Sequence, residues 1–217
     1  MVTWQNIDTV MLDMDGTLLD LHFDNHFWLE HVPLRFAEKN GLTLEQAKET
    51  LMKRYRKAEG TLDWYCVDYW TEQLGLDIEM LKQEVDHLIA VFPYVVDFLD
   101  AVRSKNKRIV LVTNAHGKAL KIKMDRTRLG GHFDRLICSH DLGLPKEDLS
   151  FWGELQTIEP FSKQTTLFID DSLPVLRSAH AYGIANLLAV IKPDSKAPAK
   201  DVGEFKAIQS FRQIIPA

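Results

Sequence analysis

Two carboxylates one residue apart, Asp13 and Asp15, end an apolar run and stand beside Gly16 in the stretch VMLDMDGTLLD. Alternating aspartates beside a glycine are typical of EF-hand calcium loops, so calcium ligation is the first chemistry to test. That alignment fails, because it places Met11 at the first ligand position and His22 where a bidentate glutamate is required. The run predicts instead a buried strand that ends at Asp13, with a turn at Gly16. Both carboxylates would then lie at the carboxyl end of a strand, where open α/β sheets keep their ligands.

Three further groups of polar residues follow apolar runs in the same way. They are Thr113 with Asn114, Lys146 in the loop GLPKED, and Asp170 with Asp171 and Ser172. Carboxylates, a lysine and hydroxyl groups are residue types that phosphate chemistry uses. Because the carboxyl ends of parallel strands converge on one crevice in a doubly wound sheet, we expect these groups and the first pair to form one site.

The elements that would position these groups alternate between short apolar runs and helical segments. The apolar runs predict strands near residues 10–12, 108–114, 135–139, 166–171 and 184–190. Runs that are apolar on both faces suit a parallel sheet covered by helices on each side. We therefore predict an α/β fold with a doubly wound, Rossmann-like parallel sheet of about five strands. The C-terminal stretch EFKAIQSFRQIIPA predicts a short closing helix.

Between the first strand and residue 93 the pattern is helical, which indicates an inserted domain. Local signals predict a break or restart at Pro33, a capping box at 43–46, helix ends near Gly60 and at Gly75, and an N-cap at Asp77. One helix is expected over the stretch LDWYCVDYWTEQLG, and the helix after Asp77 carries an apolar stripe that extends to Phe92. We predict an α/β core of residues 1–20 and 93–217 and an α-helical cap of residues 21–92.

Composition is that of an ordinary globular protein and disfavours some partners. The 217 residues are 46% hydrophobic and 26% charged, with a formal net charge of −5. A net acidic chain without Lys/Arg runs disfavours nucleic acid as a partner. No window approaches the roughly 20 apolar residues that cross a bilayer, and the stretch MVTWQNIDTV does not resemble a secretory signal. Cys66 and Cys138 form no CxxC pair, so we expect free thiols in a cytoplasmic protein that binds no membrane.

Taken in order, the four polar groups resemble the motifs of the haloacid dehalogenase superfamily, specifically its phosphatases with an aspartate nucleophile. The matching stretches are VMLDMDGT, IVLVTN, GLPKED and LFIDD, and together they cover nearly the whole chain. The helical block lies where one branch of that family carries its cap domain. The stretches FDNHFW and DWYCVDYW, with TNAH and PKED, are similar to the bacterial purine 5′-nucleotidases that act on GMP and IMP.

The resemblance implies a role for each residue of the motifs. Asp13 would attack phosphorus and form an aspartyl-phosphate. Asp15 would protonate the leaving oxygen and then deprotonate the water that hydrolyses this intermediate. Thr113 and the backbone N–H of Asn114 would hold the phosphoryl oxygens, and Lys146 would add positive charge where negative charge develops.

A cation is expected in the same site, because the carboxylates and the substrate phosphate repel one another. Two unit negative charges about 4 Å apart repel by about 4 kcal/mol at an effective dielectric of about 20, and a phosphate dianion roughly doubles that. Mg²⁺ typically binds one or two carboxylates together with a substrate phosphate. By the resemblance its ligands are the Asp13 side chain, the Asp15 backbone carbonyl and the pair Asp170 and Asp171, with Asp171 the preferred direct ligand.

Other residues could contact the remainder of the substrate. Four neighbouring aromatic residues are expected mostly to pack in the core of the cap, while one or two of them could stack on a purine. They are Trp64, Tyr65, Tyr69 and Trp70. Four histidines near the motif loops are expected to be mostly surface or packing residues, with one plausible substrate contact at His116: His22, His26, His116 and His140. A basic residue of the cap, such as Arg54 or Lys57, could also contact the substrate, and the sequence does not favour one over the other.

The sequence therefore predicts an Mg²⁺-dependent phosphomonoesterase, a purine nucleoside 5′-monophosphatase acting on GMP and IMP. Its partner would be a small phosphorylated metabolite, and its oligomeric state is left open. A phosphosugar phosphatase or mutase would carry the same four motifs. A dehalogenase would share the fold and nucleophile but would have no use for Asp15 or for the pair Asp170 and Asp171. A non-catalytic binding protein on the same scaffold is the remaining alternative.

Overall fold

The first apolar run forms a central strand of the sheet in the computed structural model, which describes residues 2–216. The strands are β1 (Thr9–Leu12), β2 (Arg108–Thr113), β3 (Arg135–Cys138), β4 (Thr166–Asp170), β5 (Asn186–Val190) and β6 (Ala207–Ile208). All are parallel, in the spatial order β3-β2-β1-β4-β5-β6. The prediction of an α/β, doubly wound, Rossmann-like sheet is confirmed. The strand order reverses between β1 and β4, which is where such sheets bind ligands.

The helices of residues 2–216 fall into an inserted group and a group that alternates with the strands. The inserted group is α1 (His22–His26), α2 (Val32–Asn40), α3 (Leu44–Ala58), α4 (Leu62–Tyr65), α5 (Val67–Leu74) and α6 (Ile78–Glu84). The alternating group is α7 (Val95–Ser104), α8 (Gly117–Thr127), α9 (Leu149–Ile158) and α10 (Leu173–Tyr182). Short 3₁₀-helices lie at Trp4–Asn6, Asp86–Leu88, Leu129–His132, Ser139–Asp141 and Phe211–Ile214, and a π-helical turn at Phe27–His31.

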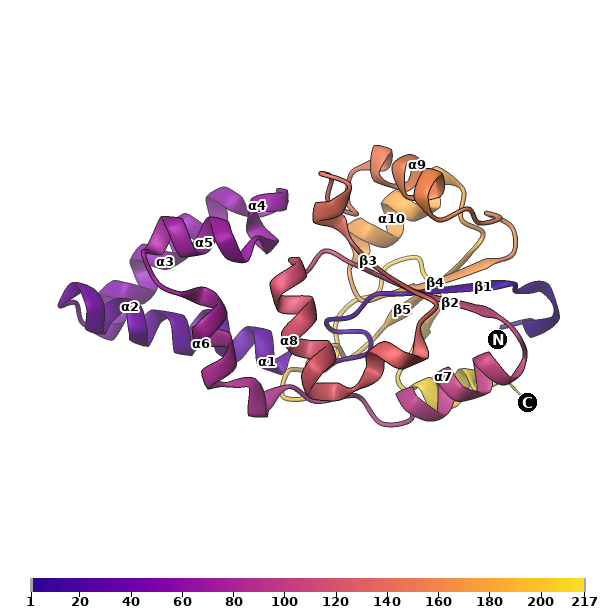
Figure 1. Ribbon diagram of the computed structural model, residues 1–217, viewed down its shortest axis with the longest axis horizontal. Coiled ribbons are helices and arrows are strands. Elements are labelled where there is room, and N and C mark those ends of the chain that lie inside the picture. The colour runs from indigo at the N-terminus through magenta and orange to yellow at the C-terminus, as the bar shows by residue number, and fades with distance from the viewer. Residues whose placement is uncertain (1, 217) are drawn as a thin grey trace.

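The strands are apolar throughout because both faces of the sheet are covered. Val10 and Leu12 pack into one apolar cluster together with residues of α7 and α8. Met11, which points to the opposite face, packs with residues of α9 and α10. Figure 1 shows α9 and α10 above the sheet and α7 below it. The near-continuous apolar runs of the sequence thus reflect a sheet between two helical layers.

Helices α1–α6 extend from one end of the sheet, at the left of Figure 1. The chain leaves for this block and returns from it through two paired connections. The N–H of Phe92 donates to the carbonyl of Leu18, and the N–H of Asp20 donates to the carbonyl of Ala90. That residues 21–92 behave as a separate cap domain remains a prediction.

The helix expected over LDWYCVDYWTEQLG is in fact two helices, α4 and α5. The chain bends at Cys66, whose backbone is extended at φ −84 and ψ 115. The Cys66 sulfur accepts a hydrogen bond from the N–H of Tyr69 at 3.4 Å and thereby caps α5. The apolar spacing did not reveal this break, because apolar residues of α4 and α5 continue on both sides of Cys66.

The ends of three other elements, α6, the C-terminal stretch and α2, can also be compared with the prediction. Asp77 caps α6, as expected, by accepting from the N–H of Met80, but α6 ends at Glu84 instead of following its apolar stripe. The C-terminal stretch forms β6 and a 3₁₀-helix, not one closing helix. Near Pro33 the π-helical turn gives way to α2, and the proline lies in the first turn of α2, where its missing N–H is tolerated.

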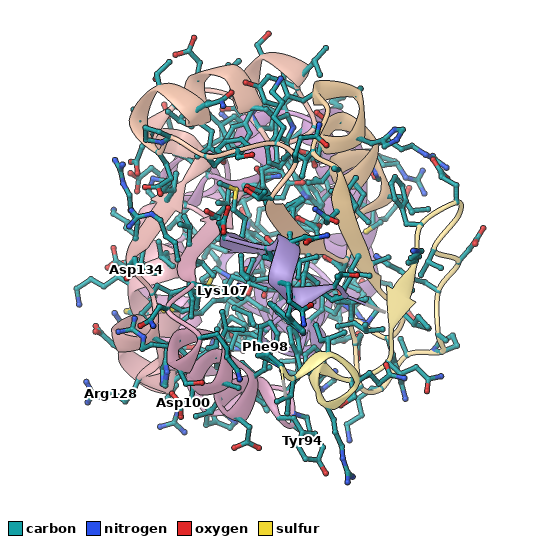
Figure 2. The ribbon with its side chains drawn as sticks, turned by 90° about the vertical axis from the view of Figure 1, so that its right-hand side faces the viewer. Tyr94, Phe98, Asp100, Lys107, Arg128 and Asp134 are labelled. Carbon is teal, nitrogen blue, oxygen red and sulfur yellow. The ribbon has the colours of Figure 1, made fainter. Side chains whose placement is uncertain are left out.

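Figure 2 faces the end of the molecule opposite α1–α6. Lys107 directly precedes β2 and Asp134 directly precedes β3, so the strands begin at this end. The carboxyl ends of the strands, and the polar residues that follow them, therefore point toward α1–α6.

Candidate active site

The strand register brings Asp13 and Asp170 level with each other at the point where the strand order reverses. Leu12 of β1 pairs with Ile169 of β4, so the next residue on each strand is an aspartate. The Nζ of Lys146 lies 2.6 Å from Asp13 Oδ1 and 2.7 Å from Asp170 Oδ2. It also donates to the carbonyl of Val112 on β2 at 3.1 Å. One buried ammonium group thus joins the ends of β1, β2 and β4.

A third carboxylate, Asp171, completes an acidic cluster. Asp13, Asp170 and Asp171 each offer an oxygen, and these oxygens all lie within 4.8 Å of one another. The Nζ of Lys200 lies 2.9 Å from Asp171 Oδ2. Three carboxylate oxygens so close together form a donor set suited to a hard divalent cation.

Gly16 is required by the same cluster. Its φ of +82° is in the left-handed region that residues with a side chain rarely adopt. A Cβ at this position would lie 2.7 Å from Asp171 Cγ and 2.9 Å from Asp171 Oδ2. The glycine of the first motif therefore allows the turn after β1 to approach the carboxylate that follows β4.

Thr113 and Asn114 lie at the end of β2, next to Asp13 in the sheet. The Thr113 hydroxyl oxygen accepts from the N–H of Ala115 at 3.0 Å, so it shapes the turn and does not cap α8, whose N-cap is His116. The side chain of Asn114 accepts from the N–H of Lys146 at 2.9 Å and donates to Glu147 at 2.8 Å. Asn114 thus fixes the loop that carries Lys146.

The sequence also predicts that Glu147 and Asp148 serve the next helix, and only Asp148 does so. Asp148 accepts from the N–H of Ser150 and caps α9. Glu147 turns instead toward the helical block, where the Tyr65 hydroxyl donates to its Oε1 at 2.7 Å. A hydrogen-bonded bridge therefore runs from α4 through Glu147 to Asn114.

Asp15 heads a chain of buried charges that the sequence reasoning missed. Lys123 of α8 lies 2.6 Å from Asp15 and 2.7 Å from Asp24 of α1, and Lys82 of α6 lies 3.2 Å from Asp24. The side chains of Lys82 and Lys123 are only 4% and 2% exposed. Lys82 stands at a stripe position, four residues after buried Ile78, and a lysine in an apolar stripe is the signal that could have identified it.

The protonation of the acidic groups is shifted by burial. Burial raises the pKa of Asp13 to about 6, against the opposing charge of Lys146. Burial likewise raises the pKa of Asp15 to about 6, although Lys123 acts in the opposite direction. For Lys146, burial favours a lower pKa, but the charges of Asp13 and Asp170 outweigh it and the pKa is raised. Lys146 is therefore a permanent cation in the site.

These groups lie at one end of a cavity of about 450 Å³, within the range of about 300–1,000 Å³ that is usual for small-molecule sites. Asp13, Asp15, Thr113, Asn114, Lys146, Asp170 and Asp171 all line it. The helical block contributes its other wall, which includes Trp28, Tyr55, Trp64 and Tyr65. The structure thus brings every residue of the predicted site into one cavity.

Among the described residues, only part of the predicted substrate-contacting set reaches this cavity. Trp64 and Tyr65 line it, whereas Tyr69 and Trp70 do not, and Trp70 is buried in the aromatic core of the block. Within residues 2–216, the cations that the block contributes to the lining are Arg56 and Lys82, neither of which the sequence reasoning singled out, whereas Arg54 and Lys57 are not among the lining residues.

The four histidines named in the sequence are also absent from the described cavity lining. His116 caps α8 through its ring nitrogen, and its ring centroid lies 4.9 Å from that of His140. His22 lies 3.8 Å from Asp194. The suggested substrate contact at His116 therefore finds no support in the geometry.

Comparisons with known proteins agree with this arrangement. The haloacid dehalogenase-like hydrolase family model matches residues 7–183. The chain is 41% identical over 216 residues to the GMP/IMP nucleotidase YrfG of Escherichia coli (strain K12), covering 100% of this chain and 97% of that protein. It is 24% identical to phosphoglycolate phosphatase 1 of Pseudomonas aeruginosa, covering 95% of this chain and 78% of that protein. A HAD phosphatase from Thermococcus onnurineus has the same fold, with a TM-score of 0.81, 18% identity and 96% of each chain covered.

Within residues 2–216, no helix is both long and apolar enough to span a membrane.

Proposed function

This chain belongs to the haloacid dehalogenase-like hydrolases, and we propose that it is a phosphomonoesterase that hydrolyses purine nucleoside 5′-monophosphates, GMP and IMP in particular. The observation that carries the proposal is the contact of Lys146 with both Asp13 and Asp170 at one end of a cavity whose other wall is aromatic. The four-motif resemblance is borne out by the family model. The whole-length identity to a GMP/IMP nucleotidase supports the substrate class.

In the first step Asp13 attacks the phosphorus atom. Lys146 donates a hydrogen bond to Asp13 Oδ1, which leaves the second oxygen of the carboxylate free to attack. A bond forms from that oxygen to phosphorus, and the bond from phosphorus to the 5′-oxygen of the nucleoside breaks. The electron pair goes to the leaving oxygen, which takes a proton from Asp15. Burial favours the protonated form of Asp15 that this step needs.

In the second step water attacks the phosphorus of the aspartyl-phosphate. Asp15, now a carboxylate, takes the proton of that water, and the bond from phosphorus to Asp13 breaks. Phosphate leaves and both carboxylic groups return to their starting states. Lys146 and the backbone N–H of Asn114 stabilise the charge on the phosphoryl oxygens, and Thr113 shapes the turn that presents that N–H.

The acidic cluster fits Mg²⁺, which when bound would neutralise the repulsion between the carboxylates and the substrate phosphate. The residues that would hold it are Asp13, the backbone carbonyl of Asp15, and Asp171 with Asp170. Asp171 is the better direct ligand. Both oxygens of Asp170 are already engaged, by Lys146 and by the N–H of Ser172. Within residues 2–216, the Asp171 side chain accepts a hydrogen bond at Oδ2, from Lys200, and none at Oδ1.

The competing substrate class is a sugar phosphate, and a rate comparison separates the two. We would measure phosphate release with Mg²⁺ from GMP, IMP, AMP, pyrimidine nucleotides, ribose 5-phosphate and glucose phosphates, and compare kcat/KM. Preference for GMP and IMP is expected. Preference for a sugar phosphate would retain the chemistry and overturn the nucleotidase assignment. Release from none of these compounds would overturn both and favour a non-catalytic binding role.

We further propose that the reaction takes place in the cytoplasm, where nucleoside monophosphates are present. Cell fractionation followed by detection of the protein tests this location directly.

A further inference from the structure

One face of α3 and the residue after it line the cavity on the side away from the carboxylates. Met52, Tyr55, Arg56 and Glu59 all contribute to the lining, and their spacing of three and four residues places them on one side of the helix. Arg54 and Lys57 fall on other sides of α3. The same helix therefore presents one cation and one carboxylate to the cavity.

These two charges are free to bind a ligand. Within residues 2–216, neither the Arg56 nor the Glu59 side chain makes a hydrogen bond or an ion pair with another residue, although they stand three residues apart. Elsewhere on α3, Lys48 pairs with Glu30, Lys53 with Glu49, and Arg54 donates to the carbonyl of Gln73, whereas Lys57, outside the described lining, makes no such contact either. What distinguishes Arg56 and Glu59 is their place: both are exposed at the cavity and uncommitted, so together they can bind a ligand with both an acceptor and a donor.

The aromatic wall beside this pair is held in place. Tyr55 lies edge-on to Trp28 and Trp64, with ring centroids 5.8 and 5.9 Å away. The Tyr55 hydroxyl donates to the backbone carbonyl of Trp28 at 3.3 Å. A fixed group of rings suits a flat heterocycle, because aromatic side chains stack on bases without regard to their identity. Selection among bases must then come from the polar groups at the edge.

We propose that Arg56 and Glu59 recognise the six-membered edge of a 6-oxopurine, an inference that rests on the proposed nucleotidase function. A 6-oxopurine presents the O6 acceptor next to the N1–H donor, and an arginine next to a carboxylate complements this order. Adenine presents the reverse, an amino donor next to the N1 acceptor. Both contacts would then be unfavourable, so the pair selects against AMP in two ways.

The substituent at position 2 of the purine ring gives Arg56 and Glu59 a second basis for discriminating among purine nucleotides. Guanine carries an amino group there, which can donate to the second oxygen of Glu59, whereas hypoxanthine carries only hydrogen. Xanthine carries a carbonyl oxygen, which a carboxylate repels. The expected order of kcat/KM is GMP, then IMP, with XMP and AMP both lower by about 10- to 100-fold, the range expected for hydrogen bonds to charged groups.

Two substitutions test the pair, each measured with GMP, IMP, XMP, AMP and ribose 5-phosphate. Glu59→Gln keeps the shape but adds a donor. We expect it to lower kcat/KM for GMP by about 10-fold or more and to reduce discrimination against XMP and AMP. Arg56→Met keeps an apolar stem and should lower the rates with GMP, IMP and XMP, which share O6, more than the rate with AMP. Lys57→Met, one residue along and outside the described cavity lining, is the matched control.

Ribose 5-phosphate, which has no base, separates recognition from general damage. Its kcat/KM should stay within about 2-fold of the unsubstituted protein in both variants. Equal loss on ribose 5-phosphate and GMP, or unchanged GMP-to-AMP and GMP-to-XMP ratios in both variants, would overturn the inference. The unsubstituted protein tests the proposed function separately. If it hydrolyses ribose 5-phosphate as well as GMP, the nucleotidase assignment fails before any variant is compared. If it prefers GMP and the variants keep that preference, only the roles of Arg56 and Glu59 fail.

Discussion

At the scale of single residues, Lys146 stabilises two carboxylates that could not otherwise be buried together. Asp13 and Asp170 are 6% and 1% exposed, and each lies within 2.7 Å of the same ammonium group. Burying a carboxylate without a partner costs several kcal/mol. The lysine therefore holds Asp13, the proposed nucleophile, in place.

The first prediction concerns the nucleophile. Asp13→Asn replaces a carboxylate with an amide that cannot form an acyl-phosphate in the same way, so kcat should fall by at least about 1,000-fold. Phosphate release from GMP measures this, and circular dichroism checks that the protein is folded. Asp68→Asn, an exposed carboxylate outside the described cavity lining, is the control and should retain activity. Normal turnover by a folded Asp13→Asn protein would exclude the aspartyl-phosphate scheme.

The second prediction concerns Gly16. Gly16→Ala and Gly41→Ala both place a side chain at positive φ, 82° and 64°, and each should cost about 1 kcal/mol of stability. Only the first places a Cβ against Asp171, whereas Gly41 has open space around it. Gly16→Ala should therefore raise the Mg²⁺ concentration needed for half-maximal activity, and Gly41→Ala should not. Equal Mg²⁺ requirements in the two variants would contradict the placement of Asp171 as a ligand.

At this scale the sequence predicted the polar residues that follow strands and missed the charged residues that reach the cavity from helices. Asp13, Lys146 and Asp170 could be grouped because parallel strands end at one edge of a sheet. Asp24, Lys82 and Lys123 come from three helices far apart in sequence, and no local pattern states that α1, α6 and α8 meet. Arg56 was missed for the same reason, since the side of α3 that faces the cavity depends on how α3 packs.

At the scale of elements, Tyr65 and Glu147 link the helical block to the catalytic loops. The Tyr65 hydroxyl of α4 donates to Glu147, which also accepts from Asn114. Asn114 in turn accepts from the N–H of Lys146. The position of α4 is therefore coupled to the loop that carries Lys146.

The third prediction follows from this link. Tyr65→Phe removes one hydroxyl and should lower kcat/KM for GMP by about 2- to 10-fold, the effect expected for one hydrogen bond. Tyr69→Phe in α5 is the matched control, because Tyr69 is outside the described cavity lining. If both variants behave alike, the bridge through Glu147 does not position the loop.

Element type was more predictable than element boundary. Five of the strands follow from apolar runs, because burial of both faces leaves a clear signal. The two-residue strand β6 leaves none, since its pairing with β5 depends on the preceding loop returning to the sheet edge. The break between α4 and α5 was missed because a cysteine sulfur at an N-cap is an uncommon acceptor.

At the scale of the whole molecule, the cavity holds more negative than positive charge. Its lining holds the carboxylates of Asp13, Asp15, Asp24, Glu59, Asp170 and Asp171 and the cations Arg56, Lys82, Lys123 and Lys146. A bound divalent cation would balance this excess before a phosphate dianion enters. Metal binding and pH should therefore affect the stability of the entire fold together.

The fourth prediction concerns this coupling. Burial raises the pKa of Asp13 from 3.8 to about 6, so between these pH values the folded state holds more protons than the unfolded state. Without metal, the ionisation of Asp13 therefore lowers the free energy of unfolding as pH rises from 3.8 to about 6. Mg²⁺ needs ionised ligands, so its stabilising effect should grow from about pH 5 to about pH 7.5.

Thermal unfolding with Mg²⁺ and with a chelator, at several pH values, measures the effect. The difference between the two Tm values removes contributions such as those of His116 and His140, which titrate in both forms. We expect the difference to increase with pH and to shrink in Asp13→Asn. A difference that is absent, or independent of pH, would contradict a metal site at the acidic cluster. Restored Mg²⁺ should also restore hydrolysis after chelation.

The position of β1 between β2 and β4 also has a consequence for biosynthesis. The ribosome makes β1 before both of its neighbours in the sheet, because β2 and β4 come after the whole helical block in sequence. During translation this fully buried strand therefore has no neighbouring strand to pair with, a situation that favours aggregation and slow closure of the sheet. A nascent chain carries Asp13 long before it carries Lys146 and Asp170. Asp13, the proposed nucleophile, therefore gains Lys146 as a partner only after the 133 residues that separate the two in sequence have been made.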